Sequence, residues 1–562
     1  MVRWYSPLLL IRIALRTFVA TVIGKIVDNR EIQAALSPIK DDDLLHGAYD
    51  LSKEKKNSYW IDYVADIGDG WDSTYAVANL LAKKELIIDG ISKPLPKGEL
   101  LVMGGDEVYP DPSMKAYTER TLAPYSLACE NHKKDDDGLK SHLFAIPGNH
   151  DWYDGLQAFN NIFCQARGYS NSAESFKIAG WKTSQKRSYF SIKLPHRWWL
   201  CGVDIQLGTG ANTTQIDYFR EIAETQMKAG DRIILCCPTP EWLHAEVGET
   251  GMMQSFTEIM PVLSHTGAKV RLVLAGDVHH YSRYHSKANG MQFVTAGGGG
   301  AFMHPTHKLP QQLGAKSKNK KRPQLNLETH YPSKKESYSL SHKLFLFPFT
   351  NWDFALAIGA VYTLLAWIFE ARTLAIGESM SSIFMKWLSG NISTIDGLLS
   401  FFTAIPKSPA FALIVFGIYV GFIKFNFTKR KIISFGLGMA HAMAHFAPFI
   451  LAYFIASYTA SQIREDQILN NIDSFLTFIA IIFVLGSLLG GFVYGVYLWV
   501  ALNVFGLQWT NAFSALRICN YRNFIRIHMN SKGELIIYPL KVDDISQKPH
   551  KVELIEQPFT IK

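Results

Sequence analysis

Four short stretches of the sequence place residues that bind metal ions or transfer protons directly after apolar runs. They are ADIGDG, GGDEVYP, PGNHDW and AGDVHHY, and their polar residues are Asp66, Asp106, Asn149, His150, Asp151, Asp277, His279 and His280. Carboxylates, an amide oxygen and imidazoles form the mixed ligand set that Mn, Fe or Zn accepts. One such stretch alone is usually an ordinary turn, but four in succession predict a shared metal site.

The apolar runs before these stretches predict the strands that position them. Between residues 59 and 295 short apolar runs alternate with polar or helical stretches, which is typical of a layered α/β fold. The apolar runs in WIDYVAD, ELLVMGGD, HLFAIPGNHD, DRIILCCP and VRLVLAGD each end in Asp, Asn, Cys or Gly. Because ligands gather at the carboxyl ends of strands in such folds, we expect these ends to face one site.

In order and spacing, the four stretches resemble the motifs of the calcineurin-like metallophosphoesterase superfamily over about residues 58–304, and PGNHDWYDG is the most specific of them. The resemblance implies an α/β fold with a β-sandwich flanked by helices. It also implies two divalent or trivalent metal ions (Mn, Fe or Zn) and hydrolysis of a phosphate ester or pyrophosphate. By this resemblance Asp106 bridges the two ions, Asp66 and His279 bind one ion, and Asn149 binds the other.

The same resemblance assigns catalytic roles to two further residues. His150 would contact the phosphate or protonate the leaving group, and Asp151 would orient its imidazole. Two neighbouring cations can polarise a phosphoryl group and activate water for attack at phosphorus. An imidazole titrates near neutrality, so it suits the proton transfer to the leaving oxygen.

One departure from the family pattern points to a subgroup. Gly68 stands where most members have a histidine. The purple acid phosphatase branch also lacks that histidine and uses a tyrosine three residues after the bridging aspartate, and Tyr109 has this spacing from Asp106. Tyr109 is therefore a candidate ligand, with a packed tyrosine at a strand end as the alternative.

Other departures concern the remaining ligands. Cys236 or Cys237 follows the strand after which the family usually has a histidine; Cys237 is a candidate thiolate ligand, with a buried core cysteine as the alternative. Asp277 replaces the first histidine of Gly-His-x-His and can still bind a metal. After a run of four glycines, His304 is either a replacement ligand or a loop histidine.

The sequence after residue 350 has membrane character. Four apolar spans are predicted near residues 354–369, 409–423, 432–458 and 474–502, and the mixed segment 383–402 is expected at the interface. The loop between the second and third spans contains Lys424, Lys429, Arg430 and Lys431, so it should be cytoplasmic. Counting spans from this loop predicts that the metallophosphoesterase domain and the C-terminal tail are cytoplasmic too.

Two histidines of the third span, His441 and His445, are one helical turn apart. Ionisable groups inside a membrane suggest a functional surface, whereas neutral imidazoles hydrogen-bonded within the bundle are the structural alternative.

The chain thus divides into five predicted regions. They are an N-terminal segment (1–57) with an amphipathic interfacial helix from Pro7 to Ile23, the metallophosphoesterase domain (58–307), a basic linker (308–345), transmembrane helices (346–505) and a cytoplasmic tail with a β-hairpin (506–562). The formal net charge of +8 is concentrated in the linker, beside the first span, which favours contact with membrane lipids. No nucleic-acid-binding pattern is present, and six cysteines without metal or disulfide spacing indicate reduced thiols.

The sequence therefore predicts a multi-pass, membrane-anchored, metal-dependent phosphoesterase. The anchor favours a lipid-linked phosphate ester as substrate without requiring one. The alternative is a catalytically weak or inactive module that binds phosphate and is coupled to the membrane bundle.

Overall fold

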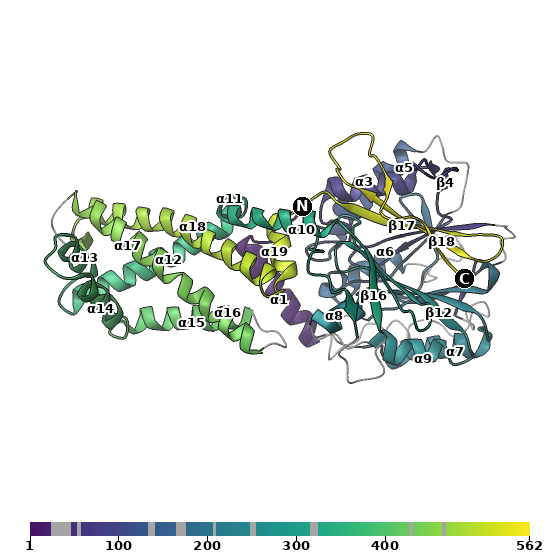
Figure 1. Cartoon of the computed structure of the whole chain (residues 1–562), viewed down its shortest axis with the longest axis horizontal. Helices are drawn as coiled ribbons and strands as arrows, with labels where there is room; N and C mark the ends of the chain where they lie inside the picture. The colour runs from purple at the N-terminus through teal and green to yellow at the C-terminus, as the bar shows by residue number, and fades with distance from the viewer. Residues whose placement is uncertain are drawn as a thin grey trace. The chain divides into compact units, whose positions relative to one another are not determined.

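The structure is a computed structural model that describes residues 1–23, 47–52, 58–132, 141–164, 176–205, 210–247, 254–314, 324–425, 431–463 and 468–562. The chain forms two compact units (Figure 1). The sheet unit contains Met1–Val2, Ile11–Tyr338 and Arg517–Lys562, and the helical unit contains Arg3–Leu10 and Ser339–Leu516.

The sheet unit contains two nine-stranded sheets and a small hairpin of β3 (Glu85–Leu86) and β4 (Leu95–Pro96). The first sheet has the spatial order β1 (Tyr49–Asp50), β9 (Phe190–Leu194), β10 (Trp198–Gly202), β11 (Arg232–Cys237), β12 (Lys269–Ala275), β14 (Gln292–Ala296), β13 (Tyr281–His285), β16 (Leu325–Tyr331) and β15 (Gln312–Leu313). The second has the order β19 (Glu553–Leu554), β18 (Leu535–Val542), β17 (Arg522–Met529), β2 (Tyr59–Val64), β5 (Leu100–Met103), β6 (His142–Ala145), β8 (Trp181–Thr183) and β7 (Phe176–Ile178), with β20 (Phe559–Ile561) beside β18.

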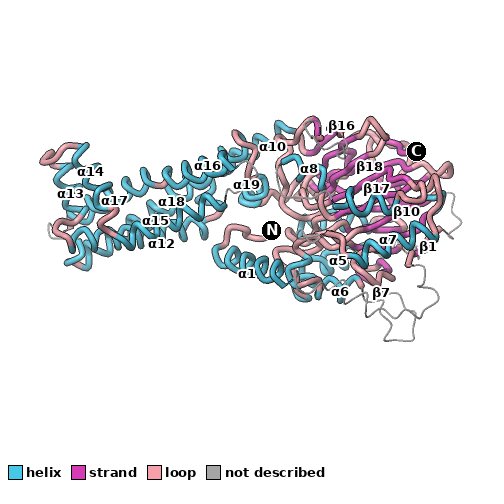
Figure 2. The backbone as a smooth tube through the Cα atoms, turned by 90° about the horizontal axis from the view of Figure 1, so that it is seen from below, coloured by secondary structure: helices cyan, strands magenta, loops and turns pink. Residues whose placement is uncertain are grey.

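The main core lies between the two sheets. It joins Leu100 and Phe144 of the second sheet to Leu200 and Leu272 of the first, all fully buried. On the other face of the second sheet lie α3 (Trp71–Ala82), α5 (Ala123–Asn131) and α6 (Gln157–Phe163), which share a second core with the sheet. Figure 2 shows the strands with helices around them. The expected β-sandwich flanked by helices is confirmed.

The sheet unit contains further helices and single helical turns. They are α1 (Pro7–Ile23), which continues into the helical unit, α4 (Met114–Tyr117), η1 (Thr118–Leu122), η3 (Asp151–Asp154), η4 (Pro195–Arg197), α7 (Thr213–Thr225), α8 (Glu241–Val247), η5 (Ser255–Ile259), α9 (Met260–Leu263) and part of α10 (Lys334–Ser341).

The parallel strands β2, β5 and β6 of one sheet and β11 and β12 of the other end in the predicted motifs. Parallel neighbours have their carboxyl ends at the same edge, so the motifs that follow them are brought together as the sequence predicted.

The C-terminal tail forms part of the second sheet. The predicted hairpin is present as β17 and β18, and β17 pairs antiparallel with β2, Ile525 opposite Tyr63. The buried Arg526 guanidinium forms an ion pair with the Asp62 carboxylate, with Nε 2.7 Å from Oδ1. Residues 517–562 therefore belong to the sheet unit, whereas the sequence predicted a separate region at 506–562.

The helical unit contains α11 (Phe347–Thr350), α12 (Trp352–Ala375), α13 (Met380–Leu388), α14 (Thr394–Ala404), α15 (Pro409–Phe425), α16 (Lys431–Ala444), α17 (Phe446–Ser461), α18 (Ile472–Asn503) and α19 (Trp509–Leu516), with the 3₁₀ turns η6 (His342–Leu346) and η7 (Ile468–Asn470). Residues 352–375, 431–461 and 472–503 are long and apolar enough to cross a membrane, which confirms three of the predicted spans. The span predicted at 409–423 is one arm of a pair, α14 and α15, bent by 86°. The segment expected at the interface, 383–402, falls in α13 and α14.

His441 and His445 lie at the junction of α16 and α17, and their Nε2 atoms are 3.3 Å apart. The Tyr362 hydroxyl lies 2.8 Å from His445 Nδ1, and the His441 ring stacks on Tyr497 at 3.8 Å. These contacts match the structural alternative, hydrogen-bonded imidazoles within the bundle. The basic residues predicted at 316–322 and 429–430 lie outside the described residues.

Candidate metal centre

Three aspartates follow strands in a left-handed backbone conformation. Asp66 after β2, Asp106 after β5 and Asp277 after β12 have φ angles of 59°, 54° and 66°. This conformation is costly for residues with a side chain, although aspartate tolerates it better than most. Such strain tends to persist at functional sites, where the surrounding structure holds it in place. The three turns bring the three residues together, and the Asp277 N–H donates to the Asp66 carboxylate at 2.9 Å.

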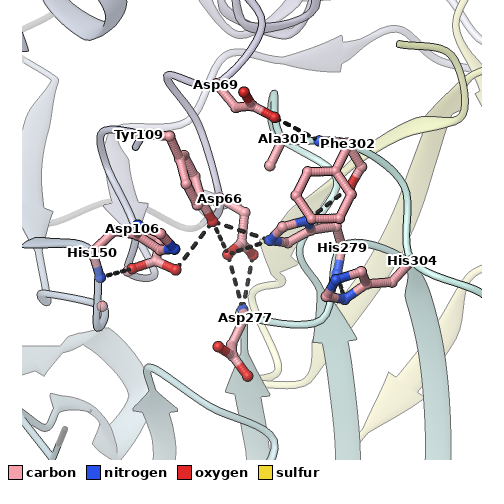
Figure 3. Close-up of polar contacts among 12 residues, drawn as sticks. Asp66, Asp69, Asp106, Tyr109, His150, Asp277, His279, Ala301, Phe302 and His304 are labelled. Carbon is pink, nitrogen blue, oxygen red and sulfur yellow. Dashed lines mark hydrogen bonds and ion pairs between the residues drawn. The ribbon is translucent and has the colours of Figure 1, made fainter. Parts of the chain in front are cut away.

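The Tyr109 hydroxyl lies at the centre of the site. It is 3.0 Å from Asp66 Oδ1, 3.0 Å from Asp106 Oδ2 and 3.0 Å from His279 Nε2 (Figure 3). A tyrosine hydroxyl carries a single proton, so it cannot donate to both carboxylates at once. Three candidate ligands, Asp66, Asp106 and His279, thus converge on the hydroxyl of a fourth, Tyr109.

The His279 ring is held in the orientation of a metal ligand. Its Nδ1 is 2.7 Å from the Phe302 carbonyl oxygen, which can only accept, so Nδ1 carries the proton. The lone pair of Nε2 then faces Tyr109 and Asp66. Burial lowers the pKa of His279 well below its usual value, so the ring stays neutral. A carbonyl that fixes the tautomer in this way is the usual support of a metal-bound histidine.

The two central carboxylates need a positive charge. Burial and the neighbouring Asp106 and Asp277 raise the pKa of Asp66 well above its ordinary value. Burial and Asp277 raise the pKa of Asp106 to about 7. Buried acids that repel one another are stabilised by a metal ion, which replaces the missing counter-charge.

A second group of candidate ligands lies beside the first, and it includes a residue that the sequence analysis did not predict. His244, on α8, has its Nε2 2.6 Å from Asp277 Oδ2. Burial alone would raise the pKa of Asp277, but the hydrogen bond and charge of His244 lower it below its ordinary value. His244 lies on the helix after β11, seven residues beyond Cys237. The family pattern places its histidine directly after this strand, so the pattern did not point to His244.

Asn149 lies at the start of a turn on the same edge. Its side-chain nitrogen donates to the Tyr153 hydroxyl at 3.0 Å, which leaves its oxygen as the atom that could bind a metal. The neighbouring backbone also contacts the first group, because the His150 N–H donates to Asp106 Oδ1 at 2.8 Å. Asp106 is thus held between the two ligand groups, as the bridging role requires.

Cys237 and His304, the two alternative ligands, have other contacts. The buried Cys237 thiol lies 3.4 Å from the Ser255 hydroxyl, and burial raises its pKa, so it remains a neutral thiol. His304 stacks on His279 with ring centroids 4.2 Å apart, and its Nδ1 accepts from the His279 N–H. These contacts favour a core cysteine and a histidine that supports His279.

The relation expected between His150 and Asp151 is corrected. His150 Nδ1 is 2.6 Å from the Pro110 carbonyl oxygen, which orients the ring. Asp151 instead accepts the Gly148 N–H at 2.7 Å and the Glu107 N–H at 3.2 Å, together with the Tyr117 hydroxyl. It therefore fixes the loop that carries Asn149 and His150. Adjacent residues in a tight turn point in different directions, which the sequence motif does not show.

Two glycines make the site possible. A Cβ atom at Gly297, the first residue of the glycine run, would lie 2.4 Å from Asp66 Oδ2. Gly68 has a φ angle of +79°, and a Cβ there would lie 2.7 Å from the Glu107 carbonyl oxygen. The backbone at position 68 therefore requires glycine, and the histidine that most family members have there would not fit.

The residues present fit a pair of metal ions by their chemistry. Asp66, Asp106, Tyr109 and His279 would hold one ion, and Asp106, Asn149, His244 and Asp277 the other. Within the described ranges no group of three or more His, Cys, Asp or Glu side chains is already arranged around a metal position. The Tyr109 hydroxyl accounts for this in the first group, because it occupies the point on which the other three converge.

Comparison with known families agrees with this chemistry. Residues 59–281 match the family described as calcineurin-like phosphoesterase, so the chain carries a calcineurin-like metallophosphoesterase domain. Members of this family use divalent metal ions, typically two. No match to a curated protein met the significance threshold.

Several solved structures are similar to the chain at low identity. "GAP50 the anchor in the inner membrane complex of Plasmodium" is 13% identical with a TM-score of 0.33, over 48% of this chain and 78% of that one. A purple acid phosphatase from yellow lupin (Lupinus luteus) seeds is 13% identical with a TM-score of 0.30, over 44% of this chain and 45% of that one. PhoD is 10% identical with a TM-score of 0.28, over 44% and 58%.

Proposed function

We propose that the chain is a membrane-anchored phosphoesterase that uses two metal ions to hydrolyse a phosphate ester or pyrophosphate. The observation that carries the proposal is the convergence of Asp66, Asp106 and His279 on the Tyr109 hydroxyl, at 3.0 Å each. When bound, such ions act as Lewis acids on the phosphoryl group and lower the pKa of water. The domain family and the three candidate spans support the two parts of the proposal.

His150 is the proposed proton donor to the leaving oxygen. Because Nδ1 is held by the Pro110 carbonyl, Nε2 is the atom that must gain and release the proton. Burial lowers the pKa of His150 to about 4, so the ring is neutral at pH 7 before substrate binds. A phosphate dianion beside the ring favours its charged form and raises this pKa, so the proton is taken up with the substrate.

Strand pairing supports a topology for the membrane part. Because β17 pairs with β2, we propose that the chain before the first span and the chain after the last lie on one side of the bilayer. Three crossings would separate these strands, so we infer an even number, which four crossings satisfy when the bent pair α14 and α15 counts as one span. The basic residues beside the spans favour the cytoplasmic side for the sheet unit.

The proposal is tested by a His150→Ala variant of the full chain in detergent, compared with a matched His265→Ala variant. Metal content by elemental analysis should be two ions per chain in the wild type and in both variants. Hydrolysis of an alkyl phosphate, whose leaving oxygen needs a proton, should fall about 10²–10⁴-fold only in His150→Ala. Hydrolysis of p-nitrophenyl phosphate, whose leaving group is stable as an anion, should fall less.

The two function hypotheses differ in the wild-type result. Metal-loaded wild type that hydrolyses no phosphate ester, while still binding inorganic phosphate, would favour the phosphate-binding module over the enzyme. If His150→Ala hydrolysed the alkyl phosphate at the wild-type rate, His150 would not be the proton donor.

A further inference from the structure

Helix α1 turns an apolar side outward, whereas its inward side carries both apolar residues (Leu9 and Ile13) and polar ones. Ile11, Leu15 and Phe18 are 59%, 62% and 68% exposed, and Val19 is also exposed. At 3.6 residues per turn these four side chains lie on one side of the helix. Arg16 and Thr17, on the opposite side, are partly buried. A surface helix of a soluble domain normally has the reverse arrangement.

Two arginines bind α1 to the segment that orients His150. Arg12, at the edge of the outward side and 54% exposed, has its Nη2 atom 2.7 Å from Asp111 Oδ2. Arg16, on the inward side, forms an ion pair with the same carboxylate. Asp111 is buried, and it follows Pro110, whose carbonyl oxygen accepts from His150 Nδ1 at 2.6 Å. Helix α1 therefore lies next to the backbone that fixes the His150 ring.

A second contact joins α1 to the candidate metal ligand Asn149. Thr17 is hydrogen-bonded to Tyr153. The Tyr153 hydroxyl in turn accepts from the Asn149 side-chain nitrogen at 3.0 Å. The helix thus has two separate connections to the metal centre, and Arg16 and Thr17 of its inward side take part in them.

The outward side has the chemistry of a lipid surface rather than of a protein partner. Ile11, Leu15, Phe18 and Val19 offer no hydrogen-bonding group, whereas interfaces between proteins carry about one hydrogen bond per 100–200 Å². An apolar side with an arginine at its edge is typical of helices that lie in the membrane interface. The same chain contains three candidate membrane spans, so a bilayer is available to cover the apolar side.

We propose that the outward side of α1 is embedded in the membrane surface, and that the phosphate ester cleaved at the adjacent site is carried by a membrane amphiphile. The substrate class is then a phosphate monoester or pyrophosphate on a lipid, whose apolar part stays in the bilayer. This inference rests on the proposed phosphoesterase function. The contacts through Asp111 and Tyr153 place the embedded helix beside His150 and Asn149, so the site opens near the membrane surface that holds such a substrate.

The first test compares two substrates with the full chain in phosphatidylcholine nanodiscs loaded with Mn²⁺. One is p-nitrophenyl phosphate in solution, and the other is phosphatidic acid in the disc. A triple variant, Ile11→Gln with Leu15→Gln and Phe18→Gln, should release phosphate from phosphatidic acid about 10-fold or more slowly because its apolar contact is lost. Its rate on p-nitrophenyl phosphate should be unchanged. Ile87→Gln, at an apolar position of the sheet unit that is 77% exposed, is the matched control and should change neither rate.

Equal loss on both substrates, an unchanged rate on phosphatidic acid, or no hydrolysis of phosphatidic acid by a wild type that cleaves the soluble ester would overturn the lipid-substrate inference. A wild type that cleaves neither substrate would contradict the proposed function instead.

A second test measures the position of α1 without using activity. Leu15→Cys and Ile87→Cys are each introduced with Cys129→Ser and Cys519→Ser, labelled with a nitrobenzoxadiazole dye, and placed in nanodiscs that contain nitroxide-labelled lipid. The dye at position 15 should be quenched and the dye at position 87 should not. An unquenched but water-shielded dye at position 15 would mean that a protein, or a second copy of this chain, covers α1, and the membrane placement would be wrong.

Discussion

The two units contain buried acids in contrasting surroundings. In the helical unit, Glu370 of α12 accepts from the Ser381 N–H at 3.1 Å and from the Ser381 and Tyr453 hydroxyls. In the sheet unit, Asp66 and Asp106 share one tyrosine hydroxyl and face a third acid, Asp277. The oxygens of Glu370 are satisfied by these hydrogen-bond donors. The crowded carboxylates of Asp66 and Asp106 lack a positive charge beside them. Burial of an acid alone therefore does not mark a metal site; crowding of buried acids without a neighbouring cation does.

Asp62 is a third case, within the same sheet as Asp66. Its carboxylate is buried against the Arg526 guanidinium, which is itself fully buried and also donates to the Leu95 carbonyl. The positive charge comes from a strand more than 400 residues further along the chain. Buried acids are thus stabilised in three ways: Glu370 by hydroxyls and a backbone N–H, Asp62 by arginine and, as we propose, Asp66 and Asp106 by metal ions.

The largest expected effect separates the first two cases. Asp106→Asn should lose bound metal and reduce hydrolysis by at least about 100-fold, since loss of a mere outer-shell partner already costs 10–100-fold. Glu370→Gln, which keeps an oxygen for the Ser381 N–H, should keep both metal and activity. The measurements are elemental analysis and phosphate release. If Asp106→Asn retained two ions, Asp106 would not be a metal ligand, and the proposed difference between Asp106 and Glu370 would be wrong.

A smaller effect is expected when the cation of Asp62 is removed. Arg526→Gln leaves a buried carboxylate unpaired and should destabilise the sheet unit by about 3–5 kcal/mol. Thermal unfolding of the full chain in detergent would report this as a lower transition temperature. The double variant Asp62→Asn with Arg526→Gln should recover part of the loss. An unchanged transition in Arg526→Gln would mean that the tail contributes little to the sheet.

The smallest effect concerns pH after metal removal. Burial and Asp277 raise the pKa of Asp106 from 3.8 to about 7, so folding favours its protonated form. The contribution of this group to stability is complete below pH 3.8 and is lost as the pH rises to about 7. The chelated protein should therefore melt at a lower temperature above pH 7 than at acid pH, because each unit of the pKa shift corresponds to about 1.4 kcal/mol. Asp106→Asn should flatten this dependence, and an equally steep one in the variant would assign it elsewhere.

The sequence by itself determined the chemistry of the site and most of the elements. Strand runs that end in Asp66, Asp106, Asn149 and Asp277 predicted their shared edge, because parallel strands bring their carboxyl ends together. The helix at Pro7–Ile23, the hairpin and three spans followed from local hydrophobic patterns and turn residues, which act over a few residues.

Only the tertiary structure decided which distant residues complete these elements. His244 reaches Asp277 across the site from α8, and no spacing rule connects a helix to the loop after another strand. The Pro110 carbonyl, not Asp151, orients His150, because side-chain direction in a tight turn depends on backbone angles. The tail completes the sheet beside β2 because two edges far apart in sequence are complementary in hydrogen bonds and in the charges of Asp62 and Arg526. Such pairings arise from contacts in space and leave no periodic signal along the chain.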